Sequence, residues 1–164
     1  MKYVLAISLC LLTAACSQTN HMQLADYGNF SVIKPIGWLA TENEGIYTFE
    51  PMANSSQTIT FFASKVPKNM TADLQKLVEL GLTSLHTKLP DLTVVSKAKP
   101  TTLGQFSAIE IQFTAIVDQD KMMFTQIFAK PKNRIYTLTY TCKADACNYF
   151  KEFYAIAKTM QIRS

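Results

Sequence analysis

The second half of the chain contains three consecutive strand patterns that are joined by very short turns. Residues 106–117 alternate between apolar and polar side chains over most of their length, which is the period of a β-strand. The segments 118–121 and 130–133 have turn compositions and separate this pattern from further strands at 122–129 and 134–142. Strands joined by such short turns run antiparallel, because a parallel connection needs about a dozen residues or more. The sequence therefore predicts an antiparallel meander.

Four shorter strand patterns accompany the meander, each ended by proline or by a change to polar residues. They are residues 30–34, 45–50, 57–64 and 92–99. Pro35, Pro51 and Pro100 follow three of them, and proline ends a strand because it cannot donate to the hydrogen-bond ladder. Gly37 and Trp38 are predicted to complete a turn after the first strand.

Two helices are predicted from apolar residues that recur with a period of 3.6. The first begins after Thr71, a good N-cap, and ends before Pro90. The second begins with Asp145 as its N-cap, carries Cys147 in its first turn and runs to about Met160. The central strands are apolar on both sides, so both faces need cover. The sequence predicts an α+β fold with an antiparallel sheet of about six or seven strands flanked by one helix on each face.

The start of the chain has the composition of a secretory signal. A basic start with Lys2 is followed by an apolar run at residues 4–12, which is too short to cross a bilayer, and by small residues up to Ala15. The cysteine that follows makes this segment resemble the lipobox of bacterial lipoproteins. That resemblance implies that residues 1–15 are removed and that Cys16 is acylated on its sulfur and on its new amine. No later run is apolar enough to cross a bilayer, so the lipid would be the only membrane attachment.

The mature chain is expected to hold a short tether and one domain. Residues 16–27 are polar and aperiodic and suit a tether, and residues 28–164 form the single domain. Hydrophobic residues make up 48% of the sequence, which is enough for a core. The net charge of +4 falls to +3 when the leader with Lys2 is removed. The basic residues form no run interleaved with aromatic residues, so nucleic acid is a poor partner.

The cysteines that remain after Cys16 form a pair in the second half of the chain. Cys142 and Cys147 are an even pair in an exported chain, which predicts a disulfide. The alternative is a redox-active pair. It lacks the C-x-x-C spacing and the βαβ context of thioredoxin-like proteins.

The opening of the domain and its tail carry a family resemblance. The segment 28–38 reads Gly-Asn-Phe-Ser-Val-Ile-Lys-Pro-Ile-Gly-Trp, and residues 136–140 precede the last helix. Both resemble the PsbP/Mog-type α+β fold over roughly residues 28–162. With a lipoprotein signal, the chain is similar to the DcrB-type envelope lipoproteins of Gram-negative bacteria. The resemblance transfers no catalytic residue, and it implies an accessory or binding role.

Few side chains suggest metal chemistry. His21 and His86 have no neighbours that would form a metal pair or a catalytic triad. Asp118 and Asp120 form a D-x-D in a hairpin and could hold a hard cation weakly, although aspartate is also common in turns for backbone reasons. No metal, cofactor or catalytic residue is predicted, since no glycine-rich phosphate loop and no hydrolase motif is present.

Two further groups of side chains have a structural and a functional interpretation. Glu42 and Glu44 could pair for acid–base work or lie in a solvated loop. Aromatic residues gather near the first strands, where they form either core or a binding surface at the sheet edge. The candidate surface residues are Trp38, Tyr47, Phe49 and Phe62, next to Phe61.

The leading hypothesis is a non-catalytic, lipid-anchored periplasmic protein that binds an envelope protein partner in assembly, secretion or uptake. Ser17 stands where family members retained in the inner membrane have aspartate, so we expect the outer membrane. One alternative is an envelope hydrolase, which predicts a cluster of acidic residues, serine and lysine. No motif in the sequence points to such a cluster. Another is a cytoplasmic protein that starts at Met22 and keeps Cys142 and Cys147 reduced.

Overall fold

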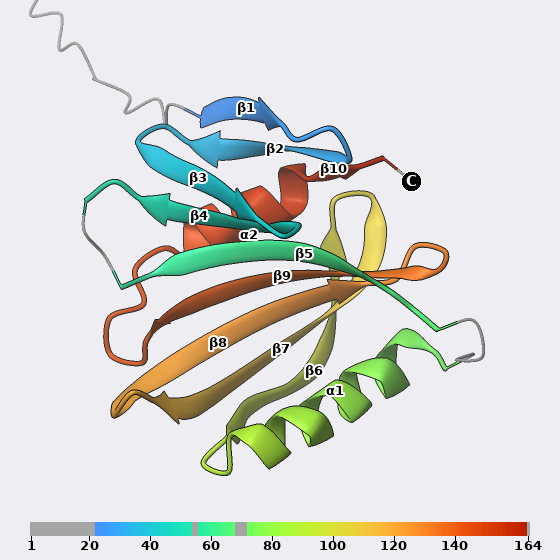
Figure 1. Ribbon diagram of the computed structural model, residues 1–164, viewed down its shortest axis with the longest axis vertical. Helices are drawn as coiled ribbons and strands as arrows, with labels where there is room; N and C mark the ends of the chain where they lie inside the picture. The colour runs from blue at the N-terminus through green and yellow to red at the C-terminus, as the bar shows by residue number, and fades with distance from the viewer. Residues whose placement is uncertain (1–21, 54–55, 68–71, 164) are drawn as a thin grey trace, which may run out of the picture.

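The computed structural model describes residues 22–53, 56–67 and 72–163, and Figure 1 shows their arrangement. Within these residues the chain forms ten strands and two helices. The strands are β1 (Met22–Asp26), β2 (Phe30–Pro35), β3 (Trp38–Asn43), β4 (Ile46–Pro51), β5 (Thr58–Lys65), β6 (Thr93–Leu103), β7 (Phe106–Val117), β8 (Asp120–Ala129), β9 (Arg134–Lys143) and β10 (Gln161–Ile162). The helices are α1 (Leu74–Lys88) and α2 (Phe150–Thr159).

The main sheet has seven strands in the order β3-β4-β5-β9-β8-β7-β6, and all neighbouring strands are antiparallel. The predicted meander is confirmed as β7-β8-β9. Asp118 and Gln119 form the turn between β7 and β8 with φ angles of 49° and 72°. Positive φ at both positions suits a two-residue hairpin turn, because it matches the twist of the strands. Trp38 was predicted to lie in a turn and instead begins the edge strand β3.

A second, smaller sheet has the order β1-β2-β10. The tether predicted for residues 16–27 therefore needs correction, since Met22–Asp26 is a strand that pairs with β2. Arg163 closes this sheet: its guanidinium donates to both carboxylate oxygens of Asp26 at 2.9 and 2.7 Å and to the carbonyl of Gly28 at 2.9 Å. Cys16 and the predicted leader, residues 1–15, lie outside the described residues.

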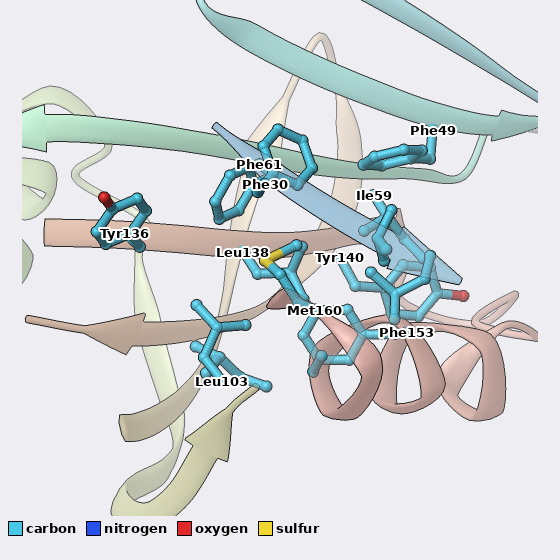
Figure 2. Close-up of a cluster of buried hydrophobic side chains, with 14 of the residues drawn as sticks. Phe30, Phe49, Ile59, Phe61, Leu103, Tyr136, Leu138, Tyr140, Phe153 and Met160 are labelled. Atoms are coloured by element: carbon cyan, nitrogen blue, oxygen red, sulfur yellow. The ribbon is translucent and has the colours of Figure 1, made fainter. Parts of the chain in front are cut away.

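The two faces of the main sheet are covered differently (Figure 1). On one face, α2 and β2 pack against the apolar side of β4, β5 and β9, and Figure 2 shows their side chains pointing toward one another. The fully buried members of this core include Phe30, Phe49, Ile59, Leu138, Tyr140, Phe153 and Ile156. On the opposite face, α1 packs against β7 and β8. The predicted α+β fold, with one helix on each face of an antiparallel sheet, is confirmed.

Helix α1 begins later than the sequence suggested. Asp73 is its N-cap, and the carboxylate accepts a hydrogen bond from the backbone N–H of Lys76 at 2.8 Å. The proposed cap Thr71 lies outside the described residues. The helix ends at Lys88, close to the predicted end before Pro90. Neither described helix has the length and apolar character to cross a bilayer.

Helix α2 also begins later, at Phe150 instead of Asp145. The Cys142–Cys147 disulfide is present, as predicted, and closes a short loop that cannot be helical across the bridge. The loop is held by Tyr140, whose hydroxyl donates to Gln57 and accepts from the backbone N–H of Tyr149 at 2.9 Å. Cys147 therefore precedes the helix and does not lie in its first turn.

Strand β6 continues through Pro100, where the sequence predicted its end. It is an edge strand, so proline can occupy a position whose N–H is not needed by a neighbour. The β6–β7 turn then packs against the end of α2. The backbone N–H of Gly104 donates to the carbonyl of Ala157 at 2.7 Å, and a β-carbon at Gly104 would lie 1.9 Å from the carbonyl oxygen of Met160.

We expect Gly104→Ala to destabilise the fold by about 3 kcal/mol or more, because the substitution adds a backbone clash to a left-handed conformation with φ +56°. Denaturant unfolding followed by circular dichroism measures the change in the free energy of unfolding.

Gly28→Ala is the matched control, since Gly28 has φ +77° and its β-carbon would contact nothing within 4 Å. It reports the backbone cost alone, roughly 1 kcal/mol. Equal losses at Gly104 and Gly28 would show that the close approach to Met160 contributes nothing to stability.

Candidate functional site

A pocket of about 490 Å³ lies at the end of the main sheet where the β1–β2, β3–β4 and β8–β9 turns come together. In Figure 1 these turns lie on the right, at the same end as the C-terminus. The volume falls within the range of about 300–1,000 Å³ that is usual for small-molecule sites. The floor and the rim of the pocket differ in their chemistry.

The floor of the pocket is aromatic. Phe61 and Tyr136 come from the neighbouring strands β5 and β9, and their ring centroids lie 6.0 Å apart with the planes nearly parallel, at 15°. Phe30 from β2 packs on Phe61 at 4.5 Å and meets Tyr47 of β4 edge-on at 4.8 Å. Each ring is therefore fixed by another, so the floor is a preformed surface.

The rim of the pocket is cationic. Lys132, Arg134 and Arg163 line it, and no carboxylate of the described residues does. Arg163 is already paired with Asp26, and this pair holds the pKa of the Asp26 carboxyl below its usual range, mainly through the hydrogen bond from Arg163. Within the part of the chain that the structure describes, Lys132 and Arg134 form no ion pair. Their charges are available to an occupant of the pocket.

The aromatic residues predicted to form one surface lie in different parts of the structure. The prediction is wrong for Trp38 and Phe49, because both are buried in the core. Trp38 lies under the edge of Tyr149, with the ring centroids 5.1 Å apart. Tyr47 is half-buried and lines the pocket.

Phe62 lies on the other face of the sheet, opposite α2. Phe62 is half-buried and pairs with Thr137 of β9. Its own strand, β5, lies two strands away from β8, against which α1 packs. Phe62 therefore cannot belong to the same surface as Tyr47.

The carboxylates considered from the sequence have local roles. Glu42 accepts a hydrogen bond from the backbone N–H of Gly45 at 2.7 Å across the β3–β4 turn. Glu44 lies in this turn with φ 51°. Asp120 pairs with Lys143 at 2.7 Å, while Asp118 forms the β7–β8 turn.

Neither of these turns gathers metal ligands. Among residues 22–53, 56–67 and 72–163 there is no group of three or more His, Cys, Asp or Glu side chains that could hold a metal ion. His86 is exposed near the end of α1, and His21 lies outside the described residues.

Sequence reasoning missed a buried ionic cluster between α2 and the sheet. Glu110 of β7 is only 2% exposed, and its Oε1 lies 2.9 Å from Nζ of Lys99 on β6. The same oxygen accepts hydrogen bonds from the Tyr154 hydroxyl at 3.0 Å and from the Gln112 amide at 3.4 Å. These bonds tie α2 to β6 and β7. The alternation of β7 predicted the face of Glu110, but not its partners.

The same cluster perturbs Tyr154. Burial, the charge of Glu110 and the hydrogen bond to it raise the pKa of Tyr154 to about 12. Because the folded-state pKa lies above the unfolded value near 10, the stabilisation is fully present below pH 10. It is lost as the pH rises from about 10 toward 12.

We expect Tyr154→Phe to lower the free energy of unfolding by about 1 kcal/mol at pH 8, through loss of the bond to Glu110. The gap to the wild type should narrow as the pH rises above 10. Urea unfolding at a series of pH values measures both. Tyr149→Phe is the control, because the hydroxyl of Tyr149 bonds to no described residue. A gap that stays constant up to pH 11.5 would contradict the role assigned to Tyr154.

Three solved structures show the same fold at low sequence identity. LpqN of Mycobacterium tuberculosis, described as involved in cell envelope biogenesis, has a TM-score of 0.64 and 17% identity over 88% of this chain and 93% of its own. The cyanobacterial PsbP (CyanoP) of Synechocystis has a TM-score of 0.62 and 12% identity, with 93% and 98% covered. A protein of Bacteroides thetaiotaomicron has a TM-score of 0.58 and 15% identity. The match covers 83% of this chain and 46% of that protein.

These likenesses confirm the PsbP-like fold. No curated protein matches the sequence significantly. Residues 42–155 match the DcrB family, a region that runs from the end of β3 into α2 and holds most of the main sheet. The chain therefore belongs to the DcrB family.

Proposed function

We propose that this protein is a non-catalytic, lipid-anchored protein of the bacterial cell envelope that acts as a binding or accessory module in assembly, secretion or uptake. The observation that carries the proposal is the bonded Cys142–Cys147 pair in a domain that starts six residues after Cys16. A disulfide of this kind is typical of exported proteins. Membership of the DcrB family and the likeness to LpqN, a protein of envelope biogenesis, support the same compartment.

A lipid on Cys16 would place the domain close to the bilayer. The six residues from Cys16 to Met22 can extend over about 20 Å at most. Met22 pairs with Pro35, so the start of β1 lies beside the β2–β3 turn. Ile36 in this turn is 57% exposed, and Met52, bonded through its N–H to the carbonyl of Gly37, is 66% exposed. This apolar end of the molecule suits the neighbourhood of lipid.

The pocket faces the other way. Strand β2 begins at Phe30, which lines the pocket, and ends at Pro35 beside the start of β1 (Figure 1). An anchored molecule would therefore present its pocket away from the membrane. For an outer-membrane lipoprotein of the inner leaflet, that direction is the periplasm.

A binding role is favoured over the hydrolase alternative by the polar groups themselves. The buried Glu110 is occupied by Lys99, Tyr154 and Gln112, and no acidic side chain from the described part of the chain lines the pocket. A hydrolase of the kind considered would need a carboxylate or serine facing bound substrate.

Labelling with radioactive palmitate tests the anchor. We expect label in the wild type and in Cys10→Ser, whose change lies inside the leader, and no label in Cys16→Ser, because only Cys16 provides the acylated sulfur. Membrane fractionation should place the labelled protein in the outer membrane. Absence of label from the wild type, with the protein in the cytosol and its thiols free, would refute the anchor and favour a start at Met22.

Photocrosslinking in intact cells tests the accessory role. A benzoylphenylalanine at position 62 replaces the half-buried Phe62 with a reactive ring on the face opposite α2. We expect a protein adduct there, since apolar side chains that remain accessible often mark a partner surface. The control places the same group at Leu80, which is 47% exposed on α1. The same adduct at both positions, or none at position 62, would contradict a partner that binds specifically around Phe62.

A further inference from the structure

The aromatic floor of the pocket is mostly buried by the fold, and Tyr47 is its most accessible ring. Phe30 and Phe61 are almost fully buried within the core, whereas Tyr47 is half-buried at the pocket. Tyr136 is 6% exposed, and Figure 2 shows its hydroxyl turned away from the cluster of buried side chains. A flat apolar group in the pocket would therefore contact mainly Tyr47, without disturbing the core.

The hydroxyls of Tyr47 and Tyr136 have no hydrogen-bond partner among the described side chains and backbone groups. A buried tyrosine normally bonds through its hydroxyl. Tyr140, four positions after Tyr136 on the same face of β9, follows this rule through Gln57 and Tyr149. The Tyr136 hydroxyl has no such partner and is not one of the buried unpartnered atoms, so it reaches solvent at the pocket and can donate to an occupant.

The rim holds like charges that the fold does not neutralise. Arg134 lies directly across from Lys65 in the β5–β9 register, and like charges in such pairs repel. Lys132 lies in the β8–β9 turn, two residues before Arg134, with φ 56°. Among the described residues none of these three cations has a carboxylate within 4 Å. An anion would relieve this repulsion and gain charge-assisted hydrogen bonds.

We propose that this pocket binds a small ligand in which an oxyanion, a carboxylate or a phosphate, is attached to a flat apolar body. The body lies against Tyr47, above the nearly buried rings of Phe61 and Tyr136. The oxyanion accepts hydrogen bonds from Lys132 and Arg134, with the Tyr136 hydroxyl as a further donor. This assignment rests on the proposed function, because it gives the binding role a ligand class, but it does not depend on acylation of Cys16.

Ligand-observed NMR titration of the full chain in a nonionic detergent tests the assignment with phenyl phosphate and benzoate as probes. We expect at least one of them to bind with a Kd of about 1 mM or below, as suits a ligand of this size. Phenol lacks the anion and inorganic phosphate lacks the apolar body, so each should bind at least about tenfold more weakly than the better probe.

Three variants locate the binding. Lys132→Gln and Arg134→Gln should each weaken the better probe about tenfold, through loss of one charge-assisted hydrogen bond. Tyr136→Phe keeps the ring and should weaken binding by a smaller factor, about threefold. Lys88→Gln, an equal charge change at the end of α1, should leave the affinity unchanged.

Several results would overturn the assignment. They are failure of both probes to bind, binding of inorganic phosphate or phenol as tight as that of the better probe, and an affinity that survives Lys132→Gln and Arg134→Gln together. The palmitate experiment is independent of all of these. If the protein is labelled but binds neither probe, the envelope proposal stands and the ligand class is wrong. If it is unlabelled but binds a probe, the ligand class stands and the anchor is wrong.

Discussion

One face of β5 and β9 carries Ile59, Phe61, Leu138 and Tyr140, and this continuous apolar surface must be covered. Helix α2 has ten residues and spans only about 15 Å, so it cannot cover the surface alone. Strand β2 supplies the rest through Phe30 and Val32. The small sheet holds β2 in that position, between β1 and β10.

The same constraint creates the pocket. The cover over β5 and β9 ends at Phe30 and at Arg163, the residue that follows β10. Beyond these residues the face of the sheet continues through Tyr136 and Arg134 toward the β8–β9 turn. The pocket is thus the part of the apolar face that the short helix and the short strand leave open. Its volume depends on the lengths of these elements, and its charge on the turn at its edge.

The elements that sequence analysis predicted well are those whose pattern is local. The β7-β8-β9 meander follows from alternation and turn composition, and both helices follow from their apolar period. The disulfide was also accessible, because only two cysteines remain after Cys16. Strand β1 was missed because Gln23 and Asp26 make it look like a tether, and only pairing with β2 gives it structure. Asp145 is a residue type that often caps helices, but the bridge between Cys142 and Cys147 keeps it outside α2.

The pocket could not be predicted, because its residues come from positions between 29 and 163 and form no motif. The register of Lys65 with Arg134 is likewise a consequence of strand pairing. Of the aromatic residues proposed for a binding surface, Trp38 and Phe49 are buried and Tyr47 lines the pocket. Tyr136 belongs to the predicted strand 134–142, but its alternation marks it only as a residue that faces the core.

Two polar clusters at the same face of the sheet have opposite chemistry. Glu110 is buried with three donors on one oxygen, so its charge is compensated within the chain. A compensated buried ion holds elements in place and is costly to disturb. At the pocket, Lys132 and Arg134 have donors in excess, and the acceptors must come from outside the chain. Since an unpaired surface charge costs little by itself, folding neither requires nor excludes Lys132 and Arg134 at the pocket. The anion binding that we propose would use both charges, at the end of β2 opposite the start of β1.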